Sequence, residues 1–218
     1  MEESMQNLEN RAFSKKIRDF FRSECNKHFW IKGKNNKIVA ANIKRAGKIH
    51  FHVYGDNNEI IINTQKRFVA DIHIGSDHCQ VNNCKIIIGE DSTAEGVIIR
   101  MLEDDLELSV GKDCMLSDDI QIFCSDIHTV YGANNQPINR GSKVEIGNHV
   151  WIGMGVYIAK KSIIANDCIV GMKSLVAGKF EEPHCVIAGN PARVVKQNIH
   201  WDRRPIKQFT ASHEKNGE

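Results

Sequence analysis

The chain has 218 residues, of which 41% are hydrophobic and 26% are charged, and its formal net charge at pH 7 is +2. These values are ordinary for one soluble globular domain, and so small a net charge excludes a strong electrostatic footprint for nucleic acid. Residues 1–30 carry charges throughout, and no window of the sequence is apolar enough to span a bilayer. The sequence therefore predicts a cytoplasmic protein with no membrane span and no nucleic-acid partner.

Residues 1–30 are predicted to form a helical appendage. Four of their apolar residues recur at helical spacing among charged ones: Phe13, Ile17, Phe20 and Phe21. Such a stripe needs an apolar surface to pack against, either the body of the same chain or a partner subunit.

From residue 31 the sequence changes to short apolar runs separated by glycine and asparagine. The phrase GKNNKI at residues 33–38 returns as GDNNEI at residues 55–60. Each phrase is a turn cluster that leads into a β-branched strand. Between them, apolar residues alternate with polar ones, as in a strand with one buried face: Ile49, Phe51 and Val53. An internal period of this kind predicts a stacked repeat.

A period of six residues is unbroken between Val144 and Gly178. Every sixth residue is aliphatic: Ile146, Ile152, Ile158, Ile164, Val170 and Val176. The residue after each of these is Gly or Ala, and the residue two before is compact. Six residues make one flat strand and one turn, and three such units close a triangular coil of about 18 residues. We expect the aliphatic residues to point into this prism and the small ones to permit its tight corners.

The predicted fold class is therefore mainly β, a parallel β-helix over residues 31–186 that follows the helical segment 1–30. Residues 187–218 form the C-terminal cap and tail, because the outermost coil of a stacked sheet has unpaired edges that need a cover. Pro191 is placed to open a short C-terminal helix, whose apolar face would hold Val194, Val195 and Ile199.

The six-residue rhythm breaks between Ile122 and Ile146, where residues 125–143 have the composition of an excursion loop. Loops inserted into a solenoid often carry its function. His128 is the candidate for chemistry, because a neutral imidazole accepts a proton near pH 7. Asp126 is close enough in sequence to orient that ring. The alternative is an ordinary surface histidine, since an isolated histidine is weak evidence of a site.

Three other groups of residues have both a structural and a functional interpretation. Trp151 either walls a site beside the returning loop or packs under it. A late cationic series is either a solvated face or a phosphate-binding one: Lys160, Lys161, Lys173, Lys179, Arg193 and Lys196. The seven cysteines have no framework spacing and read as buried thiols. His78, Cys79 and Cys84 lack a second ligand pair, so we predict no metal.

Residues 144–204 resemble the hexapeptide-repeat acyltransferases. The phrases IGNHVWIG at residues 146–153 and VIAGNPARVV at residues 186–195 look like signatures of that family. Shorter segments are similar to its branch that O-acetylates bacterial surface polysaccharides, including capsules of polysialic acid: residues 111–116, 126–128, 180–189 and 196–201. The resemblance implies that the β-helix is left-handed, which the spacing alone does not show.

The resemblance also implies acetyl-CoA as co-substrate, a carbohydrate acceptor, and a homotrimer with sites between subunits. At the matching positions it implies that His128 is the catalytic histidine and that Trp151 lines the acetyl and acceptor site. It places the backbone amides of Met154 and Met172 along the pantetheine channel and Arg193 near the nucleotide end of CoA. The residues themselves add four further candidates for cofactor contacts: Gly153, Lys173, Lys179 and Lys196. The chain departs from the family after the last hexad, where relatives carry Thr-Lys and it has Ala177-Gly178.

The expected reaction is direct acetyl transfer, with His128 deprotonating a sugar hydroxyl as it attacks the thioester. The oxyanion would be stabilised by a backbone N–H of the Gly153–Met154 turn or by the Trp151 indole. An acyl-enzyme on Cys124 is disfavoured, because that residue is in the hexad phase and should point inward. Three alternatives remain: an N-acetyltransferase of a nucleotide-linked amino sugar, a γ-type carbonic anhydrase, which needs three converging histidines, and a non-catalytic scaffold.

Overall fold

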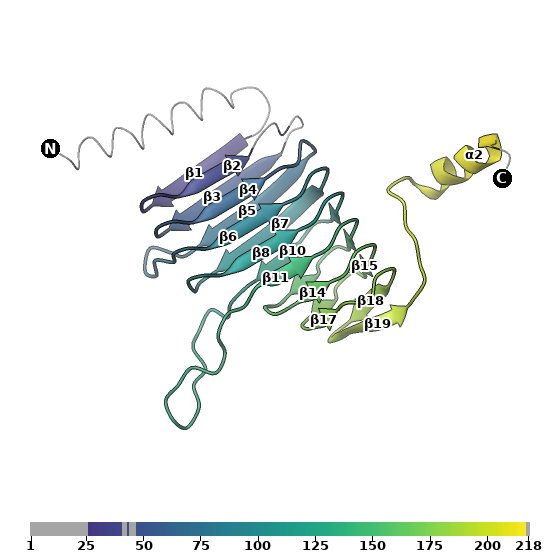
Figure 1. Cartoon of the computed structure of the whole chain (residues 1–218). Coiled ribbons are helices and arrows are strands. Elements are labelled where there is room, and N and C mark those ends of the chain that lie inside the picture. The colour runs from purple at the N-terminus through teal and green to yellow at the C-terminus, as the bar shows by residue number, and fades with distance from the viewer. Residues whose placement is uncertain (1–25, 41–42, 44–46, 217–218) are drawn as a thin grey trace.

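The computed structural model describes residues 26–40, 43 and 47–216 (Figure 1). Most of the appendage predicted over residues 1–30, with its apolar stripe, lies outside the described residues. The last five residues of that range belong to the first strand, β1 (Asn26–Lys32), so the coils begin before residue 31. A strand is favoured there because β1 pairs along its whole length with the next coil.

Short strands joined by turns stack into coils along most of the described chain. The elements after β1 are β2 (Lys37–Ala40), β3 (Lys48–Tyr54), β4 (Glu59–Ile62), β5 (Phe68–Ile74), β6 (Lys85–Ile88), β7 (Thr93–Met101), β8 (Glu107–Val110), β9 (Met115–Leu116), β10 (Ile120–Phe123), β11 (Val144–Ile146), β12 (Trp151–Ile152), β13 (Tyr157–Ile158), β14 (Ile163–Ile164), β15 (Ile169–Val170), β16 (Leu175–Val176), β17 (Lys179–Phe180), β18 (Val186–Gly189), β19 (Ala192–Lys196) and α2 (Ile206–Asn216).

Parallel pairing arranges these strands into the three faces of a prism (Figure 1). The first face runs β1-β3-β5-β7-β9-β12-β15-β18, and the third runs β2-β4-β6-β8-β11-β14-β17. The second face contains β10, β13 and β16 and joins the first through β7. The long strand β7 turns a corner, because its first residues pair with β9 and its later ones with β10. This is the parallel β-helix that the repeat predicts.

The length of a coil changes along the chain. Lys37 contacts Glu59, 22 residues later, whereas Asp56 contacts Asn82, 26 residues later. After the loop, Asn148 contacts Asn166 at a separation of 18 residues, the length of three hexads. The clear six-residue period is therefore confined to the late coils, since the earlier coils carry longer strands and turns.

A ladder of side-chain amides explains the recurring Gly-Asn-Asn phrase. Asn35, Asn57, Asn83 and Asp105 occupy equivalent corners, each with a positive φ between 56° and 59°. Asparagine and aspartate tolerate this left-handed conformation better than other non-glycine residues. Each side chain contacts the next one in the ladder. The repeated phrase thus both turns the chain and links successive coils.

The prism interior holds the aliphatic series predicted by the hexad, and all six residues are at most 3% exposed. Complete burial of one such side chain contributes about 1.5–3 kcal/mol. Five cysteines also point inward: Cys84, Cys114, Cys124, Cys168 and Cys185. Burial raises the pKa of the Cys124 thiol to about 12. This supports the sequence-based argument against Cys124 as a nucleophile, because the thiolate is the reactive form.

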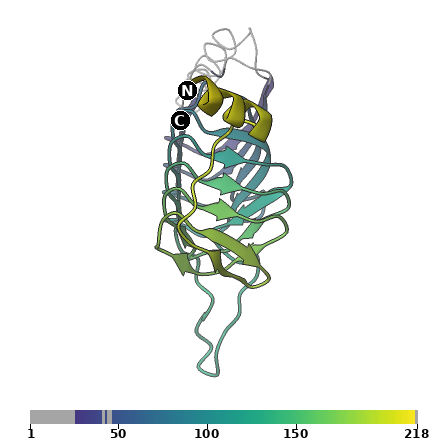
Figure 2. The same cartoon turned by 90° about the vertical axis from the view of Figure 1, so that its right-hand side faces the viewer.

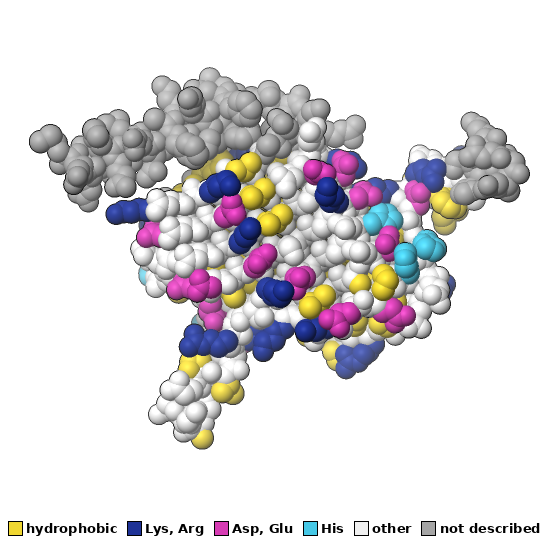
Figure 3. Space-filling view, in the orientation of Figure 1, with side chains coloured by type: hydrophobic (Ala, Val, Ile, Leu, Met, Phe, Trp, Pro, Cys, Tyr) yellow, Lys and Arg dark blue, Asp and Glu magenta, His cyan; other side chains and the backbone are white. Residues whose placement is uncertain are grey.

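The outer side of the third face carries charges of both signs. Lys37, Glu59 and Lys85 lie opposite one another in register, and Glu59 contacts both lysines at 2.7 and 3.6 Å. Figure 3 shows a diagonal row of alternating basic and acidic side chains beside a row of hydrophobic ones. Exposed pairs of this kind each contribute roughly 0–1 kcal/mol.

The C-terminal region differs from the prediction in where its helix lies. The residues after Pro191 form β19, which pairs antiparallel with β18, and the helix α2 begins only at Ile206. Val194 and Val195 are exposed, so they form no buried helical face. Pairing with the edge of the last coil outweighs the local signal for a helix start. No helix in the described part of the chain is long and apolar enough to cross a membrane.

Candidate active site

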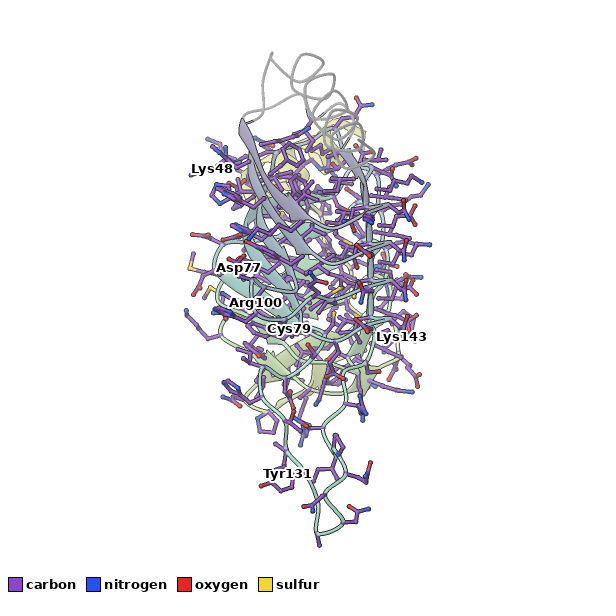
Figure 4. The ribbon with its side chains drawn as sticks, turned by 90° about the vertical axis from the view of Figure 1, so that its left-hand side faces the viewer. Lys48, Asp77, Cys79, Arg100, Tyr131 and Lys143 are labelled. Carbon is purple, nitrogen blue, oxygen red and sulfur yellow. The ribbon has the colours of Figure 1, made fainter. Side chains whose placement is uncertain are left out.

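The excursion loop leaves the prism between β10 and β11 and projects from it, with Tyr131 near its far end (Figures 1 and 4). An isolated bridge pairs Tyr131 with Pro137. The base of the loop is held by Asn139, whose side-chain amide donates to Asp126 Oδ2 and to the backbone oxygen of His128, both at 2.8 Å. The backbone at His128 is thus anchored although the loop is exposed.

The His128 imidazole itself is exposed and makes no hydrogen bond, ion pair or ring contact with other described residues. The carboxylate of Asp126 does not orient the His128 ring within this chain. It instead accepts hydrogen bonds from Lys160 Nζ at 2.6 Å and from Asn139. The hydrogen bond from Lys160 is the main cause that lowers the pKa of Asp126. Asp126 therefore helps to hold the base of the loop, because Lys160 and Asn139 both donate to its Oδ2 atom.

Trp151 is the exposed residue of the two-residue strand β12, with 37% of its surface accessible. Its neighbours in register are Met115 and Ile169, on the adjacent coils. The indole N–H donates to no group in the part of the chain that the structure describes, so it is available to a ligand. The ring centroid of a second tryptophan, Trp201, lies 6.0 Å from that of Trp151, and the two ring planes are inclined by 44°.

Trp201 anchors the C-terminal tail to the prism. Its ring stacks on the His149 ring, with 4.0 Å between the ring centroids and 7° between the ring planes. Its indole nitrogen donates to the His149 backbone oxygen at 2.9 Å. His149 occupies a left-handed corner with a φ of 52°, and its Nδ1 lies 2.9 Å from Asp167 Oδ1. His149 is therefore a turn residue of the prism, and its ring is the surface on which Trp201 packs.

Arg203 continues this attachment two residues later. Its guanidinium donates to Asp113 Oδ1 at 2.8 Å, to Thr93 Oγ1 at 3.0 Å and to the backbone oxygen of Cys114 at 2.7 Å. The tail consequently runs back along the prism toward earlier coils, as Figure 2 shows. Neither Trp201 nor Arg203 is among the site residues predicted from the sequence. The tail has no periodicity that could have marked them, apart from a tryptophan in an otherwise polar stretch.

The turn after β12 corrects the predicted role of Gly153. The Gly153 N–H donates to Val170 O at 2.8 Å, so it cannot also stabilise an oxyanion. A Cβ on Gly153 would lie 2.8 Å from Met172 N, which shows that a glycine is needed for the close approach of two coils. The side chains of Met154 and Met172 are 48% and 71% exposed. Their backbone amides donate to no group among the described residues. Met154, and not Gly153, therefore offers the free backbone N–H of this turn to a ligand.

The predicted phosphate-binding residues fall into two groups. Lys173 and Lys160 have carboxylate partners, Asp119 at 3.1 Å and Asp126 at 2.6 Å. The others have no carboxylate partner in the described part of the chain: Lys161, Lys179, Arg193 and Lys196. Among the predicted cofactor contacts, Lys179, Arg193 and Lys196 are therefore better candidates than Lys173 for binding an anionic ligand, because no intramolecular carboxylate competes for them.

A prism of hexapeptide coils with one excursion loop defines the class of the hexapeptide-repeat acetyltransferases, and comparisons with known proteins agree with this. The family "Bacterial transferase hexapeptide (six repeats)" matches residues 143–178. The polysialic acid O-acetyltransferase of Neisseria meningitidis is 32% identical over 193 residues, which are 79% of this chain and 88% of that one. The enzyme of the same name from Escherichia coli O1:K1 / APEC is 30% identical over 60% of this chain, a match that spans 42% of that relative.

The solved structure of the polySia specific acetyltransferase NeuO is similar in fold, with a TM-score of 0.63 and 25% identity over 88% of this chain and 99% of that chain. The chain belongs to the hexapeptide-repeat O-acetyltransferase family that includes the polysialic acid O-acetyltransferases. It is therefore an enzyme, and its fold is the left-handed parallel β-helix of this family.

Proposed function

We propose that this enzyme transfers the acetyl group of acetyl-CoA to a hydroxyl of a sialic-acid-containing capsule polysaccharide, with His128 as the general base. The observation that carries the proposal is the state of His128. Its backbone is anchored by Asn139, whereas its exposed imidazole has no partner among the described residues. A base must be positioned and also free to accept a proton, and His128 meets both requirements.

The proposed chemistry is a direct transfer. The sugar hydroxyl oxygen attacks the thioester carbonyl carbon while His128 takes the hydroxyl proton. The tetrahedral intermediate then collapses, the C–S bond breaks, and the proton passes from His128 to the leaving thiolate. General-base assistance of this kind typically contributes about 10²–10⁴ in rate. The Trp151 indole N–H, which donates to no described residue, would stabilise the oxyanion, because the Met154 amide is left to the cofactor.

Acetyl-CoA would lie along the turns that follow β12 and β15. There the amides of Met154 and Met172 are unpaired within the described residues and lie one coil apart, as the hydrogen bond from Lys173 N to Met154 O shows. The amides match the polar groups of pantetheine, which are themselves amides. Lys179, Arg193 and Lys196, which have no carboxylate partner in the described part of the chain, would attract the phosphates of the cofactor.

We further propose that the protein works in the cytoplasm as a homotrimer, with each site between two subunits. The free imidazole of His128 and the exposed Trp151 are the groups that an adjacent subunit would bring into a shared cleft. Light scattering of the purified protein would give about three times the 24.6 kDa chain mass. A monomer at micromolar concentration would contradict the trimer.

The function is tested by acetyl-CoA turnover against a panel of purified capsule polymers, with and without sialic acid. Thiol release and the mass of the product report the transfer, and the position of the ester is read by NMR. We expect turnover that depends on a sialic-acid polymer. Transfer to the amine of a nucleotide-linked amino sugar, with no polymer acetylated, would favour the N-acetyltransferase instead. A melting temperature that does not change with CoA would favour the non-catalytic scaffold.

A further inference from the structure

Four polar side chains form a square on the outer side of the neighbouring strands β3 and β5. His50 and His52 alternate with buried residues of β3, so both point outward, and Asp71 and His73 do the same on β5. The parallel register sets His50 beside Asp71 and His52 beside His73. Strand alternation and register, rather than a loop, therefore bring imidazoles and a carboxylate together.

The atoms of this square are close enough to share one ion. A ring nitrogen of His50, one of His52 and a carboxylate oxygen of Asp71 all lie within 4.8 Å of one another. The Nε2 atom of His73 lies 2.9 Å from Asp71 Oδ1. The Nε2 atom of His52 lies 3.5 Å from the same oxygen. That oxygen is buried, yet no hydrogen bond of acceptable geometry reaches it from the described residues. A buried carboxylate oxygen without a hydrogen bond is costly, and a cation bound between the rings and this oxygen would remove that cost.

Ring stacking leaves the edge of the His52 ring, rather than its faces, open to a ligand. The His52 ring is stacked between the rings of Trp30 and His73. The centroid distances are 4.5 and 4.4 Å, and the angles between the ring planes are 5° and 1°. Sugars and bases stack on exposed ring faces, but here the faces of His52 are covered by the neighbouring rings. The stack leaves the ring edges open, and the nitrogen lone pairs lie in the plane of each ring.

We propose that His50, His52 and Asp71 bind one first-row transition-metal ion of the Zn²⁺ type, with His73 beside Asp71 as an outer neighbour. Zinc takes imidazole nitrogen and carboxylate oxygen at about 2.0–2.2 Å, which sets tetrahedral ligand atoms about 3.3 Å apart. Separations of up to 4.8 Å close to this value by rotation of the side chains. Magnesium and calcium are disfavoured, because they select all-oxygen sites.

Two cations beside the square limit the affinity of the site. Lys48 precedes His50 by two residues on the same strand, and Arg100 lies opposite His73 in register. Figure 4 shows Lys48 and Arg100 on the same side of the prism. Their charges oppose a bound cation, and three protein ligands leave one position to water. The site should therefore bind zinc more weakly than a closed four-ligand site does. A bound ion would also link the coil of β3 to the coil of β5.

The test uses the untagged full-length protein, because a histidine tag would itself bind metal. After treatment with EDTA, the protein is dialysed against graded Zn²⁺, and bound zinc is measured by mass spectrometry. We expect one zinc per chain, and an affinity lowered at least tenfold in His52→Ala and in Asp71→Asn. His78→Ala, which removes an exposed histidine from outside the square, is the matched control and should bind like the wild type. Zinc should also raise the melting temperature of the wild type but not that of His52→Ala.

Two results would overturn the proposal: no stoichiometric zinc in the wild type, or unchanged binding in a His50→Ala/His52→Ala double variant. Circular dichroism of each metal-free variant shows whether it folds. If the alanine variants unfold, His52→Gln keeps the size and polarity of the side chain while removing the imidazole ligand, and it should show the same loss of zinc. Unchanged zinc binding in folded His52→Gln would contradict the site equally.

Discussion

Replacing Trp201 with alanine should release the C-terminal tail without unfolding the prism. The ring stacks on His149 at 4.0 Å, and its N–H donates to the His149 backbone oxygen. An aromatic stack contributes about 0.5–1.5 kcal/mol, and a hydrogen bond contributes a similar amount. The expected loss is therefore about 1–3 kcal/mol of docking free energy. Because about 1.4 kcal/mol corresponds to a factor of ten, tail opening should become about 5-fold to 150-fold more frequent.

Hydrogen exchange measures this opening at the Ile199 amide, which donates to His184 O when the tail is docked. Exchange at Ile199 should accelerate in Trp201→Ala by the factor given above, whereas amides of the prism interior should exchange as before. Ile206→Ala is the matched control, because Ile206 lies in the same tail with 83% of its surface exposed. Unchanged exchange at Ile199 in Trp201→Ala would refute the anchoring role. Equal acceleration in the two variants would refute it as well.

Two further predictions follow from the coil packing. Gly153→Ala should lower the free energy of unfolding by about 1–3 kcal/mol, because its Cβ would meet the Met172 backbone. Gly178→Ala is the control and should melt like the wild type, because its Cβ would meet nothing within 4 Å. Equal melting temperatures of the two variants would show that the coils do not pack as described. Burial raises the pKa of Cys124 to about 12 and that of Cys114 to about 11, so alkylation of the native protein at pH 8 should label exposed Cys79 before either of these two. Since unfolded thiols ionise near pH 8.5 while these remain neutral, this contribution to stability is complete below about pH 8.5 and is lost as the pH rises toward 11 or 12. Urea unfolding at pH 7, 9 and 10 measures the loss, and rapid labelling of Cys124 in the native protein at pH 8 would contradict its burial.

The late coils are predictable from sequence because each hexad position has the same surroundings in every coil. Ile152 and Ile158 point inward because they occupy the same position of the hexad. Six repetitions of the pattern allow the inward-pointing residues to be recognised from the sequence. The earlier coils have longer strands and repeat at 22 or 26 residues, so no fixed period marks their interiors. There, alternation within strands and the returning Asn turns are the readable signals.

The features that sequence reasoning missed depend on contacts between distant residues. Pro191 carries a local signal for a helix start, but the open edge of β18 turns the residues after it into a strand. Asp126 is two residues from His128, yet Lys160, 34 residues later, holds its carboxylate. Trp201 and His149 are 52 residues apart, and nothing in the local pattern of either segment indicates that they meet.

The central claim is that His128 is the general base of acetyl transfer, and the variant His128→Ala tests it most directly. The rate of acetyl transfer to a sialic-acid polymer is measured together with acetyl-CoA affinity, with His78→Ala as the matched control. We predict that kcat falls about 10²–10⁴-fold in His128→Ala while acetyl-CoA binds as in the wild type. A kcat within a few-fold of the wild type, in a folded variant, would contradict the assignment of His128 as the base.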